Sequence, residues 1–189
     1  MRRTRADSFA PLEVISVRKA SAALVAMMFG LLCMSTPAVA APGSSAPLRG
    51  VIVDMTATWP IPPLGNCPAT PPPGIVVDDP TGCWYGHVQG DIDGVIAFWE
   101  SDANYVVGQT EHFFETFAFW PDSGGYITGA DVGLWSFANG KFHSNGWVTG
   151  TSPEWTGLLG YKYFEMGTTT DPNGWPITAY GTELFLAKA

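Results

Sequence analysis

The sequence lacks the motifs that mark the common enzyme classes. It contains no GxGxxG or GxxxxGK[ST] phosphate-binding loop, no HExxH zinc-protease motif and no GxSxG nucleophile motif. It therefore gives no support to a nucleotide-binding, zinc-protease or serine-hydrolase function. It also lacks an uncharged apolar run of the roughly 20 residues that a membrane-spanning helix needs.

Basic residues are scarce, and most of them lie near the N-terminus. Five of the nine Lys and Arg fall in the first 19 residues. Beyond residue 40 the chain keeps four of them against 15 acidic residues, which is a formal charge of −11. Such a surface repels phosphate backbones and anionic lipids, so we expect neither nucleic acid nor a membrane surface as a partner.

The N-terminal segment has the pattern of a secretory signal peptide. Basic residues precede the uncharged stretch Ser21–Met34, and Ala38 and Ala40 form an A-x-A cleavage site. We therefore expect residues 1–40 to be removed and the mature protein to be secreted. An uncleaved membrane anchor or a lipid anchor at Cys33 is the alternative, but the run is short and Leu31-Leu32 is a poor lipidation context.

Three cysteines are present, and Cys33 leaves with the signal peptide. Cys67 and Cys83 remain as an even pair in an oxidising compartment, which predicts a disulfide. The alternative, a metal site, lacks a CxxC partner or a nearby histidine. The stretch beginning at Asp91 resembles a calcium loop, but Val95 stands where a third oxygen ligand is needed. We expect no metal and no other cofactor.

Short runs of aromatic and β-branched residues, separated by turn residues, are typical of an all-β protein. The predicted strands are Gly50–Trp59, Trp84–Gln89, Gly94–Trp99, Val106–Trp120, Tyr126–Phe137, Lys141–Thr149, Leu158–Thr168 and Ile177–Ala187. About eight strands are enough to close an antiparallel, calycin-like barrel. Glycines inside several of these strands favour a barrel over a β-sandwich, because a curved wall bends at glycine.

The predicted domain organisation is simple. A flexible lead-in over residues 41–48 precedes a single barrel domain over residues 49–189. Residues 60–83 form a proline-rich loop, with eight prolines between Pro60 and Pro80. Proline cannot donate to a sheet ladder, so we expect an ordered irregular loop held by the disulfide.

The second half of the chain resembles a known superfamily. The motifs are Asn139-Gly140-Lys141-Phe142, Asn145-Gly146-Trp147-Val148-Thr149, Glu154-Trp155, Leu158-Leu159-Gly160, Gly167-Thr168-Thr169 and the preceding Gly129-x-Asp131-x-Gly133-x-Trp135. They are similar to the small β-barrels of the allene oxide cyclase and dirigent-like superfamily, over about 105 residues from Trp84 onward. The resemblance implies an eight-stranded barrel with a largely apolar lumen.

The same resemblance implies a ligand class. Some members of the superfamily are cofactor-free cyclases or guide oxidised hydrophobic substrates, and many associate into oligomers. We therefore expect a small hydrophobic molecule as the ligand, with a cyclase or isomerase activity and an oligomer both compatible with the resemblance. No catalytic residue of the superfamily matches a position in this sequence.

The densest polar cluster lies in the predicted strand around His112. On a strand, side chains alternate between faces, so Glu111 and Glu115 share one face with Phe113 and Phe117 while His112 points away. If that face lines the lumen, burial raises the carboxyl pKa and creates a candidate general acid or base. If it faces outward, the two carboxylates are merely solvated.

Further candidates follow on the next strands. Asp131 lies between two glycines with Trp135 on the same face, where it is either a polar anchor in a pocket or a structural carboxylate. Glu165 and Tyr161 share a face and are candidate ligand-binding residues. Glu111, Glu115 and Asp131 are the candidate catalytic groups. The other candidate ligand-binding residues are Phe113, Phe117, Trp135, Tyr161 and Glu165.

Tryptophan is abundant, with eight residues. Buried, these side chains would fill a core or lumen; exposed in a row, they would form a platform for sugar rings, as in a non-catalytic carbohydrate-binding module. Trp155 and Trp175, beside prolines or turns, are the expected exposed ones. A third hypothesis is a structural role in which the proline-rich loop contacts a partner.

Overall fold

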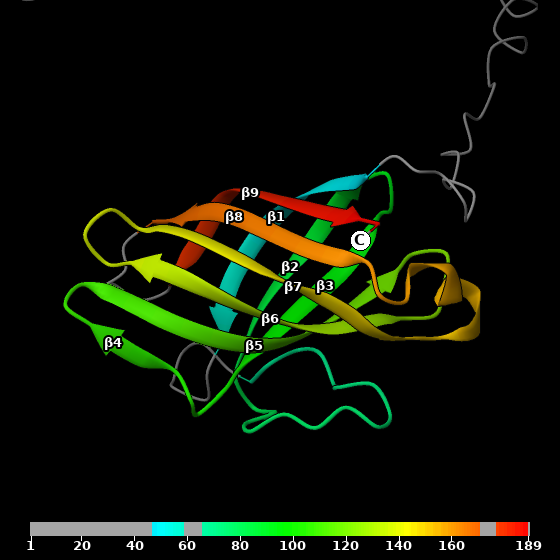
Figure 1. Ribbon diagram of the computed structural model, residues 1–189, viewed down its shortest axis with the longest axis horizontal. Helices are drawn as coiled ribbons and strands as arrows, with labels where there is room; N and C mark the ends of the chain where they lie inside the picture. The colour runs from blue at the N-terminus through cyan, green and yellow to red at the C-terminus, as the bar shows by residue number, and fades with distance from the viewer. Residues whose placement is uncertain (1–46, 59–65, 171–176, 189) are drawn as a thin grey trace, which may run out of the picture. The chain divides into compact units, whose positions relative to one another are not determined.

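Nine antiparallel β-strands form one sheet in the part of the chain that the structure describes, and this sheet closes on itself (Figure 1). The computed structural model describes residues 47–58, 66–170 and 177–188. The elements are β1 (Leu48–Thr58), β2 (Cys83–Gly90), β3 (Gly94–Glu100), β4 (Tyr105–Val107), β5 (Thr110–Pro121), β6 (Ile127–Ser136), β7 (Lys141–Thr151), the 3-10 helix η1 (Pro153–Leu158), β8 (Lys162–Thr169) and β9 (Thr178–Ala187).

Closure is made by β3 and β5, which pair over seven residues from Gly94–Pro121 to Glu100–Glu115. The sheet order is β3-β2-β1-β9-β8-β7-β6-β5-β4, so eight strands complete the barrel and β4 extends β5 beyond it. The predicted all-β, eight-stranded antiparallel barrel is confirmed.

Two predicted strands differ from the observed ones. The predicted strand over 106–120 is a hairpin, because Gly108 adopts a positive φ of 65° that turns the chain between β4 and β5. The predicted strand over 158–168 begins only at Lys162, since Leu158 ends η1. Both differences arise where the turn lacks the Asn-Gly or Pro-Asp signals found at the β6-β7 and β5-β6 connections.

Alternation along the strands places large apolar side chains inside the barrel. On β5, Phe113, Phe117 and Phe119 are buried whereas Phe114 is 38 % exposed on the outer face. The lumen is therefore filled over much of its length by the side chains of a single core, including Ile52, Ile96, Phe98, Phe117, Ile127, Val148, Tyr163, Leu184 and Leu186.

A β-bulge in β1 decides which of its residues face the lumen. The register with β2 shifts between Val53 and Thr56, and Asp54 adopts a positive φ of 54°. Without this extra residue, simple alternation from buried Ile52 would turn Asp54 inward. The bulge leaves Asp54 exposed and directs Met55 into the interior instead.

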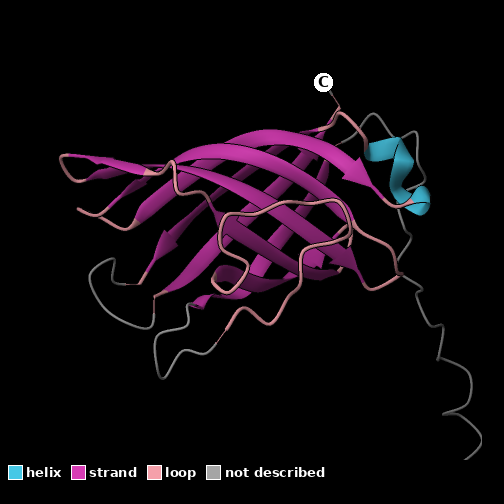
Figure 2. Ribbon diagram, turned by 90° about the horizontal axis from the view of Figure 1, so that it is seen from below, coloured by secondary structure: helices cyan, strands magenta, loops and turns pink. Residues whose placement is uncertain are grey.

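The helix η1 lies at one end of the barrel (Figure 2), and its side chains pack into the core and plug that end. Trp155 and Leu158 of this helix are buried in the core, and the Trp155 indole Nε1 donates to the Gly124 carbonyl oxygen at 2.9 Å. The expectation that Trp155 is exposed is therefore wrong. A buried indole with its N–H satisfied packs as well as any aliphatic residue.

The predicted disulfide between Cys67 and Cys83 is present, with a Cα–Cα distance of 5.3 Å. It anchors the described part of the proline-rich loop to the outer wall, where Cys67, Ala69 and Val77 pack against a second small core. That core contains Cys83, Ala97, Trp99 and Ala118. The loop thus covers the side of the barrel over β2, β3 and β5.

The predicted signal peptide over residues 1–40 lies outside the described residues. Among the residues that are described, no helix is long and apolar enough to cross a membrane. The disulfide is compatible with a secreted protein.

Candidate functional site

Three carboxyl groups stand side by side across neighbouring strands of the barrel. Glu100 of β3 pairs directly with Glu115 of β5, and Glu115 pairs directly with Asp131 of β6. Glu115 and Asp131 are buried, at 8 % and 3 % exposure, and Glu100 is partly buried. Like charges at directly opposed positions destabilise a sheet, so this row is costly if all three groups are ionised.

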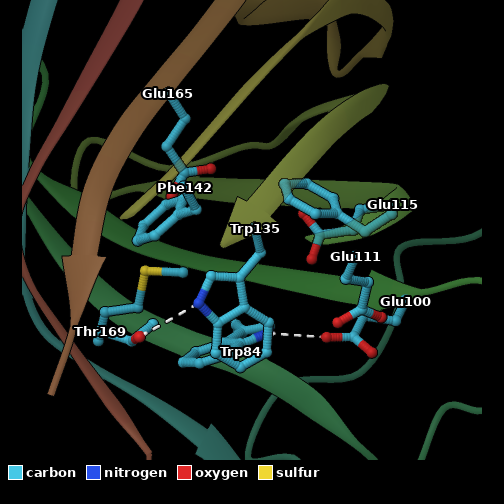
Figure 3. Close-up of a pocket in the computed structure, with 10 residues that line it drawn as sticks. Trp84, Glu100, Glu111, Glu115, Trp135, Phe142, Glu165 and Thr169 are labelled. Atoms are coloured by element: carbon cyan, nitrogen blue, oxygen red, sulfur yellow. Dashed lines mark hydrogen bonds between the residues drawn. The ribbon is translucent and has the colours of Figure 1, made fainter. Parts of the chain in front are cut away.

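Glu100 and Glu115 of this row line a cavity (Figure 3), which lies at the end of the barrel away from η1. Its volume is about 30 Å³, within about 370 Å³ of empty space that includes the solvent at its mouth. A cavity of this size holds one or two water molecules. The lining side chains are Met55, Trp84, Glu100, Glu111, Phe113, Glu115, Trp135, Phe142, Glu165 and Thr169.

Burial raises the pKa values of the inner carboxyl groups. It raises the pKa of Glu115 well above its ordinary value, and the neighbouring Asp131 and Glu100 raise it further. It raises the pKa of Asp131 to about 7, with Ser144 counteracting part of the increase. Desolvation is the first cause in each case, because a carboxylate loses its hydration inside the barrel.

Glu165 enters the cavity from β8 on the opposite wall. Burial first, and then the charge of Asp131, raise the pKa of Glu165 to about 8. The Tyr163 hydroxyl donates a hydrogen bond of 2.8 Å to Glu165 Oε2. Desolvation and the surrounding carboxyl groups raise the pKa of Tyr163 well above 10, so the phenol remains a donor.

Two tryptophans form the wall between these carboxyl groups. Trp84 Nε1 donates to Glu100 Oε1 at 2.9 Å, and Trp135 Nε1 donates to Thr169 Oγ1 at 3.2 Å. The two indole rings meet edge to face, with centroids 6.0 Å apart. Burial raises the pKa of Glu100 to about 7. The hydrogen bond from the Trp84 indole counteracts part of this increase, because it stabilises the ionised carboxylate.

Glu111 is the outermost carboxyl group of the cavity. Its side chain is partly buried, and desolvation raises its pKa while Asn104, whose Nδ2 lies 3.4 Å from Glu111 Oε1, lowers it. The cavity therefore runs from a partly solvated acid at the mouth to fully buried acids at the floor. Such a gradient lets neighbouring carboxyl groups hold different protonation states at one pH.

The structure brings most of the predicted site residues together. Glu111, Glu115, Glu165, Trp135 and Phe113 all line the cavity. Asp131 lies beside Glu115 just below the cavity floor, and Phe117 lies deeper still, stacked on Tyr163 with ring centroids 4.4 Å apart. Tyr161 is buried, but it follows η1 near the plugged end and does not line the cavity.

Five residues that line the cavity were not among the predicted site residues: Met55, Trp84, Glu100, Phe142 and Thr169. Glu100 follows the last residue of the predicted strand over 94–99, so its alternation was not considered. Tyr163 shares the parity of Glu165, and its hydroxyl donates to that carboxyl group. Trp84 had no local signal, since its partner Glu100 becomes a neighbour only when β2 and β3 pair.

Glycine gives the cavity wall its shape. Phe113 pairs directly with Gly133, and Phe117 pairs directly with Gly129. A methyl group at either glycine would overlap the opposed aromatic ring. Each ring therefore packs against the glycine of the next strand, which confirms that these two interior glycines mark close packing in the wall.

The tryptophans give little support to a sugar-binding platform. Among the six within the described ranges, Trp147 alone is exposed, at 47 %, with Lys162 Nζ 5.3 Å from its ring centroid. Trp59 and Trp175 lie outside the described residues. One exposed ring on the outer wall does not form a row.

Comparisons of the chain with protein-family models, with curated proteins and with solved structures find no match. The similarity to allene oxide cyclase and dirigent-like barrels therefore stays a prediction, and the site is interpreted from its own chemistry.

Proposed function

We propose that the barrel lumen binds a small, largely apolar molecule and acts on it as a cofactor-independent isomerase or cyclase. The observation that carries this proposal is the group of buried carboxyls facing an aromatic cavity. Glu100, Glu115 and Glu165 reach the same cavity from three different strands. Buried acids with strongly raised pKa values, gathered at one cleft, are typical of functional sites.

The chemistry expected of such a site is proton transfer. A neutral buried carboxyl such as Glu115 would donate its proton to an oxygen of the ligand, and a neighbouring carboxylate would remove a proton from carbon. The product then has the composition of the substrate, so no cofactor or oxidant is consumed. Carboxyl groups whose pKa values lie near 7 are suited to both directions of transfer.

The size of the cavity limits the ligand. A volume of about 30 Å³ is far below that of a drug-sized pocket, so any molecule larger than a few waters requires lining side chains to move. Met55 and Glu111 are the most adaptable of these, because Met55 is long and unbranched and Glu111 is only partly buried at the mouth. We propose further that the protein acts outside the cell, after cleavage behind Ala40.

Native mass spectrometry of the protein purified from its own host tests the binding. We expect a small apolar molecule to accompany the protein and to be released on organic extraction. The variant Glu115→Gln should retain the fold and abolish turnover of that molecule. The control Glu183→Gln changes an exposed carboxyl of β9 on the outer wall and should leave turnover unchanged. An empty lumen in every preparation would contradict the proposal.

A further inference from the structure

We infer that the molecule bound in the lumen carries a protonated amine. This inference rests on the proposed function and specifies its ligand class. The amine nitrogen would lie between Glu115 and Glu165, and its apolar body would lie against Trp84, Trp135 and Phe113. All five of these residues line the cavity.

Unused acceptors are the first argument. Glu165 Oε1 is buried and accepts no hydrogen bond from any described residue, although Oε2 of the same group is bound by Tyr163. Buried polar atoms are normally paired, and those left over need an explanation. A primary ammonium offers three N–H donors, and one of them would bind Glu165 Oε1.

The walls of the cavity are the second argument. Trp84, Trp135, Phe113 and Phe142 contribute aromatic surface around the carboxyl groups. Aromatic faces attract a cation electrostatically and also bury its hydrocarbon part. A cavity that needed only to hold a neutral apolar molecule would gain nothing from four glutamates in its lining.

A missing counter-charge is the third argument. The cavity lining contains four carboxyl groups and no Lys, Arg or His among the described residues. Lys141 and Lys162 are exposed, and so are His87 and His143. His112 stacks on Tyr105 with ring centroids 4.6 Å apart, at a position that alternation places on the opposite face from Glu111 and Phe113. The positive charge that would stabilise ionised carboxylates therefore has to arrive with the ligand.

An inorganic cation fits less well. No three His, Cys, Asp or Glu side chains within the described ranges are placed to hold a metal ion. A metal ion also makes no use of the indole and phenyl surfaces. An organic cation uses both halves of the lining, the acids and the rings.

Binding of an amine should be linked to proton release. The titratable groups facing the cavity and its floor from β3, β5, β6 and β8 are Glu100, Glu111, Glu115, Asp131, Tyr163 and Glu165. Their pKa values are raised, so in the empty protein the inner carboxyls are protonated at pH 6. A cation binds the ionised carboxylate. Its affinity should therefore rise roughly tenfold for each unit by which the pH is increased, as long as the pH stays below the carboxyl pKa.

Isothermal titration calorimetry with butylamine and butan-1-ol tests the inference. The two probes match in shape and differ in charge, and the amine stays protonated between pH 6 and pH 8. We expect butylamine to bind at least tenfold more tightly at pH 8 than at pH 6. Repeating the titration in two buffers of different ionisation enthalpy should show release of about one proton. Butan-1-ol should bind weakly at both pH values.

Variants locate the effect. Glu165→Gln should lower butylamine affinity at pH 8 by tenfold or more and leave butan-1-ol unchanged, whereas the control Glu183→Gln should change neither. Equal affinity for the two probes, or binding of Ca²⁺ in place of butylamine, would overturn the amine inference and leave a lumen that binds. Failure of both probes and of every co-purified molecule would overturn the proposed function as well.

Discussion

Replacing Glu165 by Gln should stabilise the protein at alkaline pH and hardly change it at acidic pH. The folded-state pKa of Glu165 is about 8, against an ordinary value of 4.5. A raised carboxyl pKa means that the folded protein binds the proton more tightly than the unfolded chain. At pH 8 the folding chain must take up this proton or bury the charge, which costs about 4 kcal/mol. At pH 5 the cost falls to about 1 kcal/mol.

The sign of this linkage is fixed by the direction of the shift. Stability from the neutral carboxyl is fully present below pH 4.5 and is lost as pH rises through 8. Gln keeps a carbonyl oxygen for the Tyr163 hydroxyl, so the substitution removes the titration without removing the hydrogen bond of 2.8 Å. From pH 5 to pH 8, the free energy of unfolding of the variant should therefore increase by about 3 kcal/mol relative to that of the natural protein.

Urea unfolding at pH 5, 6, 7 and 8, followed by tryptophan fluorescence, measures this difference. Urea is uncharged, so ionic strength stays constant across the series. The exposed control Glu183→Gln should run parallel to the natural protein at every pH. Parallel curves for Glu165→Gln would refute the reasoning, because they would mean that Glu165 is ionised in the folded state.

Three further predictions concern the barrel wall, the disulfide and the outer surface. Gly133→Ala places a methyl group into the ring of Phe113 and should lower the free energy of unfolding by about 1–3 kcal/mol in urea, whereas an unchanged midpoint would contradict the close packing. Replacing Cys67 and Cys83 together by Ser should cost about 3 kcal/mol in the same assay, and no loss would mean that the loop is held by other contacts. In cellulose and chitin pull-downs the protein should stay in the supernatant, since Trp147 is the one exposed tryptophan described; sedimentation that Trp147→Ala abolishes would support a carbohydrate-binding module instead.

The barrel could be predicted because its signals are local. Strand alternation, the Asn139-Gly140 turn and the interior glycines each act within a few residues, and together they specify a curved antiparallel sheet. The disulfide followed from counting cysteines after the signal peptide. The 3-10 helix was missed because a six-residue element carries no periodicity of its own.

The site was only half predictable for a physical reason. Alternation puts Glu111 and Glu115 on one face, but β5 carries phenylalanine on both faces, at Phe113 and Phe114, so hydrophobicity alone cannot say which face is inside. Closure of the sheet decides it, and closure is a long-range property. The same is true of the carboxyl row, since Glu100 meets Glu115 only through the pairing of β3 with β5.

The distribution of polar groups in the lumen argues that the site is not there for stability. The plugged half of the barrel is packed with aromatic and aliphatic side chains, and the same packing at Glu100, Glu115 and Glu165 would remove several kcal/mol of desolvation cost at neutral pH. That cost is a large part of the 5–15 kcal/mol by which domains are ordinarily stable. Such a group of acids at one end of the barrel, with no Lys, Arg or His in the cavity lining that the structure describes, supports the proposal that the missing positive charge arrives with a ligand.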